Sequence, residues 1–331
     1  MDSNLSKELE HFKSLNLNID VTRGKPHGDQ LDLSKPILDD PLKSWMVDGS
    51  DIRNYGDPLG LQQARKLGAE ILDWQEELTI ACEQSSLLLI YQIITALFLH
   101  GLSQPWKSLT KPKIICPVPG FDRHFRIFED FGIEMLNLPL VGDGPDMEAF
   151  KELLDTHTEI VGIIAVPKHS NPTGDIYSED KLRAIYKLGA AYSKEFCFIF
   201  DHAYIVHDIA EDLATHPILK ISEEEGALST TAVMTSFSKV TFGGAGLSFF
   251  AGSKPMFELM VKQRSAMIIC PDRLNQQRHL QFLDNLSDIK DHMRLHASII
   301  KPKFLLVEDK LKNLPADLGN FAMPSGGYFI S

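Results

Sequence analysis

The chain has 331 residues, of which 44% are hydrophobic and 24% charged, and its formal net charge at pH 7 is -12. These values are typical of a globular protein with core enough for one large domain or two modest ones. The negative charge argues against a nucleic-acid partner, because no basic surface is available to displace counterions from phosphates. The four cysteines are far apart, which favours buried thiols in a reducing compartment over disulfides or a zinc site. We therefore expect a cytoplasmic protein.

The first twenty residues are helix-like and lack the apolar centre of a signal peptide. The longest uncharged run, 85–99, contains Gln92 and Thr95 and is too short to span a bilayer, so we predict a buried helix there. No membrane association is expected.

Short apolar runs then alternate with helical patterns, which is typical of an α/β fold with a mostly parallel central sheet flanked by helices. Most of these runs are apolar on both faces, as expected for strands covered by helices. A helix is predicted at 178–194, and a long helical pattern after Asp288 is interrupted only by Pro302. Residues 324–331 are predicted to form a turn that runs into a strand. The predicted strands are 77–82, 113–118, 134–140, 160–167, 196–201 and 231–237.

Polar residues follow several of these strands directly. Because ligands bind beyond the carboxyl ends of the strands in an open parallel sheet, side chains at these positions are expected to converge on one rim. A further set opens the helix after the first strand, where free backbone N–H groups favour a phosphate. The side chains on this rim are Asn171, Asp201, Tyr204, Ser236, Ser238 and Lys239, together with Gln84, Ser85 and Ser86.

Lys239 lies between hydroxylated residues and glycines, in the stretch "TSFSKVTFGGAG" at 235–246. A lysine, a buried carboxylate, a tyrosine and a phosphate site on one rim are the groups that hold pyridoxal 5'-phosphate as a Schiff base. Desolvation would lower the pKa of Lys239, so that its neutral amine could bond the aldehyde. Asp201 would keep the pyridine nitrogen protonated, while Asn171 and Tyr204 would donate to the phenolic oxygen. The predicted phosphate donors are Ser85, Ser86, Ser236 and Ser238.

The sequence resembles the fold-type-I, pyridoxal-phosphate-dependent aminotransferases, and within them a bacterial-type aspartate aminotransferase subgroup. Six motifs carry the resemblance in the same order. They are "TRGKP" at 22–26, "NYGDPLG" at 54–60, "CPVPGFDRHF" at 116–125, "VPKHSNPTG" at 166–174, "DHAY" at 201–204 and "SKVTFGGAG" at 238–246.

The resemblance implies further roles and a domain plan. Phe121 falls where the family stacks an aromatic ring on the cofactor, and His124 where a histidine backs the aspartate. Tyr55 falls where a tyrosine reaches the cofactor phosphate of the neighbouring subunit, which implies a homodimer with shared active sites. Gly24 and Asn171 would contact the substrate. The expected divisions are an N-terminal arm with part of a small domain at 1–45, a large cofactor-binding domain at 46–287, and a linking helix with the start of an incomplete small α/β domain at 288–331.

The implied reaction is ping-pong transfer of an amino group from an L-amino acid, of the aspartate or glutamate class, to a 2-oxo acid. Leu247 stands where most of the superfamily has a phosphate-binding arginine, a lack that the subgroup shares. Related chains continue past residue 331 to an arginine for the substrate α-carboxylate, so we expect an incomplete chain. Arg23 and Lys25 are candidates for reading the substrate side chain.

Two other functions stay open at this point. The same lysine and aspartate serve a pyridoxal-phosphate-dependent lyase, and a truncated homologue with impaired catalysis could act as a binding protein. His292 and His296 are spaced to share a helix face, as metal ligands would be. No glutamate follows His292 directly and no third ligand is evident, so no metal is expected.

Overall fold

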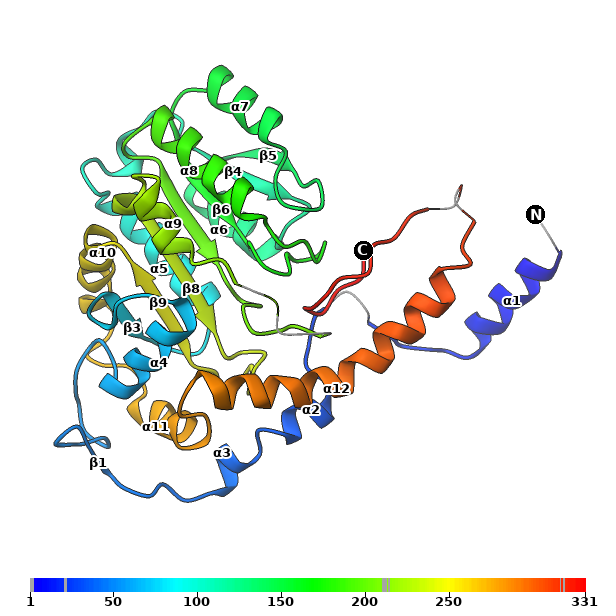
Figure 1. Cartoon of the computed structure of the whole chain (residues 1–331), viewed down its shortest axis with the longest axis horizontal. Coiled ribbons are helices and arrows are strands. Elements are labelled where there is room, and N and C mark those ends of the chain that lie inside the picture. Colours follow the sequence, from blue (N-terminus) through cyan, green and yellow to red (C-terminus); the bar gives the residue numbers. More distant parts are fainter. Residues whose placement is uncertain (1–2, 21–22, 210–212, 214, 316, 318) are drawn as a thin grey trace.

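The computed structural model describes residues 3–20, 23–209, 213, 215–315, 317 and 319–331. A seven-stranded sheet in the order β3-β9-β8-β7-β6-β4-β5 forms its centre (Figure 1). β9 runs antiparallel to both of its neighbours, and the other paired strands are parallel. The strands are β3 (Thr79–Ala81), β4 (Lys113–Val118), β5 (Glu134–Pro139), β6 (Ile160–Ala165), β7 (Cys197–Asp201), β8 (Thr231–Ser236) and β9 (Ser248–Gly252).

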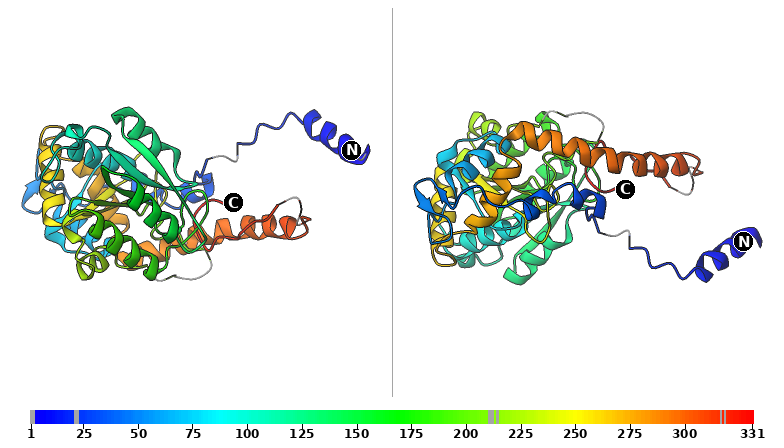
Figure 2. Two further views of the ribbon diagram at one scale, coloured as in Figure 1. Left: turned by 90° about the horizontal axis from the view of Figure 1, so that it is seen from above. Right: turned by 90° about the horizontal axis from the view of Figure 1, so that it is seen from below.

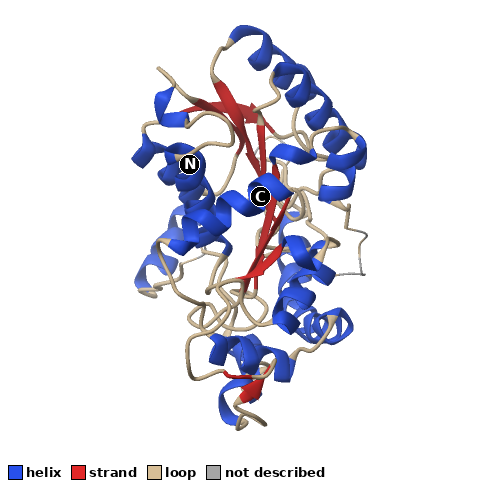
Figure 3. Cartoon of the chain, turned by 90° about the vertical axis from the view of Figure 1, so that its left-hand side faces the viewer, coloured by secondary structure: helices blue, strands red, loops and turns tan. Residues whose placement is uncertain are grey.

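Helices cover both faces of this sheet (Figure 3). Successive side chains of a strand point to opposite faces of the sheet, so the side chains of β7 show which hydrophobic cluster lies on which face. Phe198 and Phe200 belong to one hydrophobic cluster, whereas Cys197 and Ile199 belong to the other. The first cluster includes α4 (Gln62–Leu72), α7 (Met147–Thr156), α8 (Glu179–Tyr192), α9 (Ile218–Glu224) and α11 (Arg273–Phe282), and the second includes α5 (Ser86–Leu99), α6 (Asp122–Phe131) and α10 (Lys254–Ser265).

The predicted parallel α/β sheet is confirmed, and each predicted strand overlaps an observed one. β9 was not predicted. Its sequence, "SFFAG", follows a glycine-rich turn and is buried throughout, and it pairs with β8 over five residues. The predicted helices at 85–99 and 178–194 correspond to α5 and α8.

The strand predicted at the end of the chain is wrong. Residues 324–331 contain only an isolated bridge between Gly326 and Asp208. Backbone hydrogen bonds tie this segment to the loop after β7, since Ile209 N donates to Ser325 O and Gly327 N donates to His207 O, both at 2.9 Å. The C-terminal segment is therefore packed on a loop and does not extend the sheet.

The predicted long helix is α12 (Leu286–Leu311), capped by the Asn285 side chain and continuing through Pro302. α12 and α1 (Ser3–Ser14) extend beyond the sheet and its covering helices (Figure 2). The remaining elements are the short helices α2 (Gly28–Asp32) and α3 (Pro36–Asp39), the two-residue strands β1 (Met46–Val47) and β2 (Ser50–Asp51), and the 3-10 helices η1 (Glu76–Leu78), η2 (Trp106–Ser108) and η3 (Leu228–Thr230). The domain divisions at 45–46 and 287–288 stay predictions. Among the described residues, no helix has both the length and the apolar character needed to cross a bilayer.

Candidate active site

Lys239 lies in a tight turn directly after β8. Val240 N and Thr241 N both donate to Phe237 O, at 3.1 and 2.9 Å, and this closes the turn and presents Lys239 inward. Its amino group is 4.6 Å from the centre of the Tyr204 ring. Burial lowers the pKa of Lys239, and the charge of Asp201 only partly opposes this shift. A buried lysine of this kind is easier to deprotonate than one in water.

Asp201 ends β7 and is 3% exposed. By strand alternation its side chain faces the α6 side of the sheet, and His124 on α6 meets it there with Nε2 3.1 Å from Oδ2. The other carboxylate oxygen, Oδ1, is buried without a hydrogen-bond partner among the described residues. Buried carboxylate oxygens are rarely left unpaired in folded proteins. This oxygen therefore marks a place for a donor that the chain itself does not supply.

Tyr204 is 2% exposed and lies three residues beyond Asp201. Burial, aided by the nearby charge of Asp201, raises the pKa of its phenol, so the hydroxyl keeps its proton at neutral pH. Tyr204 can therefore act as a hydrogen-bond donor beside the Lys239 amine.

The predicted phosphate donors gather at the start of α5 and the end of β8. Ser85 caps α5, its Oγ accepting from Leu88 N at 3.3 Å. Ser238 Oγ donates to Gln84 O at 2.8 Å, and Ser236 Oγ lies 3.3 Å from Ser238 Oγ. A Cβ at Gly246 would stand 2.5 Å from Gln84 O, so only glycine allows this close approach. Ser86, the remaining predicted donor, is buried in the first turn of α5.

Asn171 and Phe121 lie near His124. Both line a small cavity of about 20 Å³ together with His124. The Phe121 ring meets the His124 ring edge-on, with centroids 5.1 Å apart and planes at 82°. The structure thus places the predicted aromatic neighbour next to the histidine that contacts Asp201.

The predicted outer residues take different positions. A Cβ at Gly24 would stand 2.8 Å from the Phe329 ring, so the irregular segment around Gly24 lies directly against the C-terminal segment. Arg23 pairs with Asp122 at 3.5 Å, and Lys25 forms no ion pair with another described residue. Tyr55 is 71% exposed, which leaves its predicted contact with a neighbouring subunit a prediction. Leu247 is fully buried and plays no part in a polar site.

Two residues missed by the sequence analysis complete the walls. Tyr328 has its ring centroid 6.3 Å from that of Tyr204, and its hydroxyl accepts from Gln30 Nε2 at 3.0 Å. His207 lies between the two tyrosines, with ring centroids at 5.4 and 5.8 Å. "GGYFIS" was interpreted only as a turn and strand, and an aromatic after two glycines was the available signal for Tyr328.

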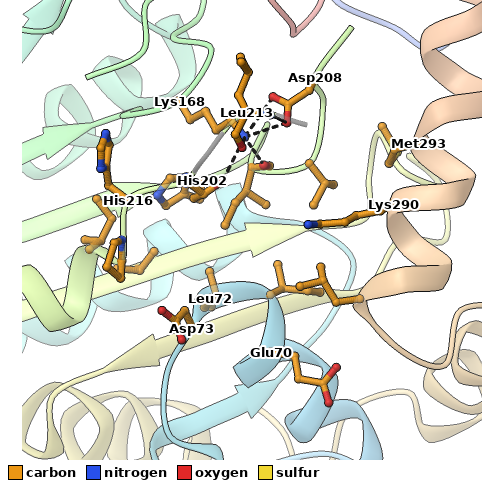
Figure 4. A pocket seen from close by; sticks show the side chains of 18 of the residues that line it. Glu70, Leu72, Asp73, Lys168, His202, Asp208, Leu213, His216, Lys290 and Met293 are labelled. Carbon is orange, nitrogen blue, oxygen red and sulfur yellow. Dashed lines mark hydrogen bonds and ion pairs between the residues drawn. The ribbon is translucent and has the colours of Figure 1, made fainter. Parts of the chain in front are cut away.

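A second buried polar cluster supports the loop after β7. Lys168 Nζ donates to Ile205 O, Asp208 Oδ2, Leu213 O and Thr215 Oγ1, at 3.0 to 3.2 Å (Figure 4). His169 Nε2 is 2.7 Å from Asp208 Oδ1. Burial opposes ionisation of Asp208, but the His169 hydrogen bond and the Lys168 charge outweigh it and lower the pKa of this carboxyl group. The cluster ties the "VPKHSNPTG" loop to the segment that carries Tyr204.

His292 and His296 on α12 meet edge-on, with their Nε2 atoms 3.0 Å apart. His292 Nε2 also lies 2.9 Å from Val240 O, and His296 Nδ1 lies 3.0 Å from Gln30 Nε2. Within the described ranges, no three His, Cys, Asp or Glu side chains are grouped to hold a metal ion. The two imidazoles therefore brace the turn that presents Lys239.

The donor set of this site fits pyridoxal 5'-phosphate. The unpaired Oδ1 of Asp201 suits a protonated ring nitrogen, the buried Lys239 amine suits an aldehyde, and the Gln84 to Ser86 turn suits a phosphate. The chemistry of these groups agrees with the interpretation of the sequence.

The fold and these groups are typical of the α/β class of pyridoxal-phosphate enzymes. The family model of the aspartate amino-transferases matches residues 1–331. The chain is 35% identical to the aspartate aminotransferase of Corynebacterium glutamicum over 335 residues, covering 99% of this chain and 77% of that protein. The chain therefore belongs to the aspartate aminotransferase family of fold-type-I aminotransferases.

Solved structures agree with this assignment. An aspartate transaminase from Corynebacterium glutamicum superposes with a TM-score of 0.92 at 35% identity, over 99% of this chain and 78% of that one. An alpha-aminoadipate aminotransferase from Thermus thermophilus, complexed with N-(5'-phosphopyridoxyl)-L-leucine, shares the fold with a TM-score of 0.76 at 17% identity, over 93% of this chain and 74% of that one.

Proposed function

We propose that the chain is a pyridoxal-phosphate-dependent aminotransferase with Lys239 as its catalytic base and cofactor anchor. One observation carries this proposal. The amine of the half-buried Lys239 lies 4.6 Å from the centre of the Tyr204 ring and within the electrostatic influence of Asp201, whose Oδ1 has no partner among the described residues. The phosphopyridoxyl ligand of the Thermus thermophilus relative supports the choice of cofactor.

The residues would divide the work of holding the cofactor. Asp201 would face the ring nitrogen, with His124 fixing the carboxylate from behind. Asn171 and Tyr204 would donate to the phenolic oxygen, and Phe121 would lie against the ring. The phosphate would take backbone N–H groups and hydroxyls from Gln84, Ser85, Ser86, Ser236 and Ser238. When bound, pyridoxal phosphate supplies an aldehyde for the amino group and a ring that accepts an electron pair from the substrate α-carbon.

Lys239 would move the proton. Burial lowers its pKa, which makes the neutral amine easier to form than in water, and a base becomes more effective as its pKa approaches the working pH. The Tyr204 ring limits the paths open to the lysine side chain. Gly24, Asn171 and the missed Tyr328 would border the substrate, because Gly24 packs on the segment that carries Tyr328.

The substrate class proposed is the aspartate and glutamate class, with ping-pong exchange against a 2-oxo acid. This substrate class is supported by the relative that is 35% identical, which is named an aspartate aminotransferase. A cytoplasmic homodimer, with Tyr55 contributing to the neighbouring site, belongs to the same proposal. The exposed position of Tyr55 leaves its ring accessible to a second subunit.

The decisive experiment is chemical capture of the anchor. Protein loaded with pyridoxal phosphate is reduced with borohydride, digested and analysed by mass spectrometry. The phosphopyridoxyl group is expected on Lys239, and Lys239→Ala is expected to lose the modification and at least about 10²-fold in kcat for aspartate with 2-oxoglutarate.

Lys66→Ala is the matched control, since Lys66 is exposed on α4. Modification of another lysine, or full activity of Lys239→Ala, would refute the proposal. Release of 2-oxo acid without an amino acceptor would instead indicate a lyase.

A further inference from the structure

A cavity of about 500 Å³ lies on the face of the sheet covered by the first hydrophobic cluster, opposite the face that His124 occupies. Figure 4 shows its lining. Its walls come from the end of α4, the loop after β7, the start of α9 and the first turns of α12. Apolar and polar side chains share the lining about equally, and most of the apolar ones belong to, or pack against, the hydrophobic cluster on this face. The buried apolar residues that line it are Ile71, Leu72, Ile205, Ile218, Val233 and Met293.

Lys290 supplies the cation of this cavity. It projects from α12 across the cavity toward the sheet, and its amino group has no hydrogen-bond or ion-pair partner in the part of the chain that the structure describes (Figure 4). Lys168 is engaged by Asp208, and Arg294 by Asp291. Lys290 is thus the lining cation that can take a new anionic partner.

The acidic groups of the lining do not oppose an anion at Lys290. Asp73 is 2.6 Å from Lys220 Nζ, which neutralises it. Asp208 is held by Lys168 and His169. The Glu70 carboxylate is directed away from the Lys290 amino group (Figure 4).

The floor of the cavity carries a second indication of a ligand. His202 is 3% exposed, lines the cavity, and has no hydrogen-bond partner on either ring nitrogen among the described residues. Buried polar groups are normally paired, so an unpaired imidazole at the base of a cavity points to a missing partner.

We propose that this cavity is a second ligand site that binds an amphipathic carboxylate, such as an aryl-alkanoic acid. Its apolar body would pack on Ile71, Leu72 and Met293, and its carboxylate would take a charge-assisted hydrogen bond from Lys290. The volume lies in the usual range for small-molecule sites, which combine apolar walls with a few polar groups. One available cation among apolar walls suits a single carboxylate better than a phosphate ester.

The site is joined to the candidate active site through one segment. His202 N donates to Met234 O at 2.7 Å, and Thr235 Oγ1 donates to His202 O at 2.9 Å. His202 directly follows Asp201, and Ile205 directly follows Tyr204. A ligand in the cavity would therefore contact the reverse side of the segment that carries two proposed catalytic residues.

The test is calorimetric titration of the full chain, loaded with pyridoxal phosphate, with 3-phenylpropionate, which has no amino or oxo group to exchange. Saturable binding is expected, and Lys290→Met is expected to weaken it at least about tenfold through the lost charge-assisted hydrogen bond. The control is Lys301→Met, an exposed lysine farther along α12. Val206→Phe, which adds bulk to the lining, is expected to weaken binding as well.

Absence of saturable binding would overturn the proposal. So would equal affinity for the uncharged 3-phenylpropanol, unchanged affinity in Lys290→Met, or unchanged affinity in Val206→Phe. Because the titration needs no turnover and both variants change only the lining of the cavity, failure of this proposal can be distinguished from failure of the proposed aminotransferase reaction.

Discussion

Two buried carboxylates on the segment 201–208 differ in how fully they are paired. Asp208 accepts hydrogen bonds from Lys168, His169 and Leu213 N. Asp201 has a single partner, His124, and its Oδ1 is unpaired among the described residues. Two lysines show the same contrast among the described residues, since Lys168 Nζ has four acceptors within hydrogen-bond distance whereas the Lys239 amino group faces the Tyr204 ring. The fully paired groups hold the loop, and we propose that the unpaired groups serve the reaction.

The largest effect is expected on stability from Asp208→Asn. This change leaves the Lys168 ammonium, whose side chain is 3% exposed, without its buried counter-ion. Removing one partner of a buried pair typically costs about 3–5 kcal/mol. Urea unfolding followed by circular dichroism should show a loss of that size. A variant as stable as the wild type would show that the cluster is not structural.

Asp201→Asn is expected to lower activity strongly while leaving stability almost unchanged. An amide can still meet His124, so the free energy of unfolding should change little. Turnover should fall about 10²–10³-fold, as when one preorganised electrostatic partner is removed from an active site. Steady-state kinetics measure the turnover, and the same urea titration measures the free energy of unfolding. An active Asp201→Asn protein would contradict the role proposed for the unpaired oxygen.

The buried histidines near these groups predict an acid-sensitive fold. Burial lowers the pKa of His296 to about 4 and that of His202 to about 3, below the value of about 6.5 for an unfolded histidine. The unfolded chain therefore binds more protons, and stability present above pH ~6.5 is lost as the pH falls toward 4. The lowered pKa of Asp208 adds to the loss at the acid end.

Each such histidine should steepen the profile by up to about 1.4 kcal/mol per pH unit. Thermal unfolding from pH 7 to pH 4 measures this slope. His296→Gln should flatten it, while replacement of the exposed His11 by Gln should not. A flat wild-type profile would contradict the burial of neutral imidazoles.

The smallest effects are expected from replacing two serines that cap helices. Ser85 caps α5 beside the proposed phosphate site, and Ser178 caps α8 with the same Oγ-to-backbone geometry at 3.3 Å. Alanine at either position should cost about 1 kcal/mol of stability. Only Ser85→Ala should also weaken retention of pyridoxal phosphate, measured by absorbance after dialysis. Equal retention in both variants would remove Ser85 from the phosphate site.

Much of the fold was predictable from local pattern. The runs at 113–118 and 160–167 are apolar on both faces, and such runs become buried parallel strands wherever helices cover them. β9 escaped prediction because "SFFAG" is short and follows "GGAG", where turn chemistry dominates. The C-terminal strand was predicted wrongly because its backbone partners are the residues 207–209, which are far away in the sequence.

The order of motifs by itself determined the family and the set of candidate residues, because each polar residue follows its strand directly and strand ends meet on one rim. Only the tertiary structure decided that Asp208 is more fully hydrogen-bonded than Asp201. It also decided that Tyr328 and His207 face Tyr204, and that His202 lines a cavity. Those facts depend on contacts between different segments of the chain, or on which face of β7 a side chain occupies, and burial and hydrogen bonding are set only once the chain has packed.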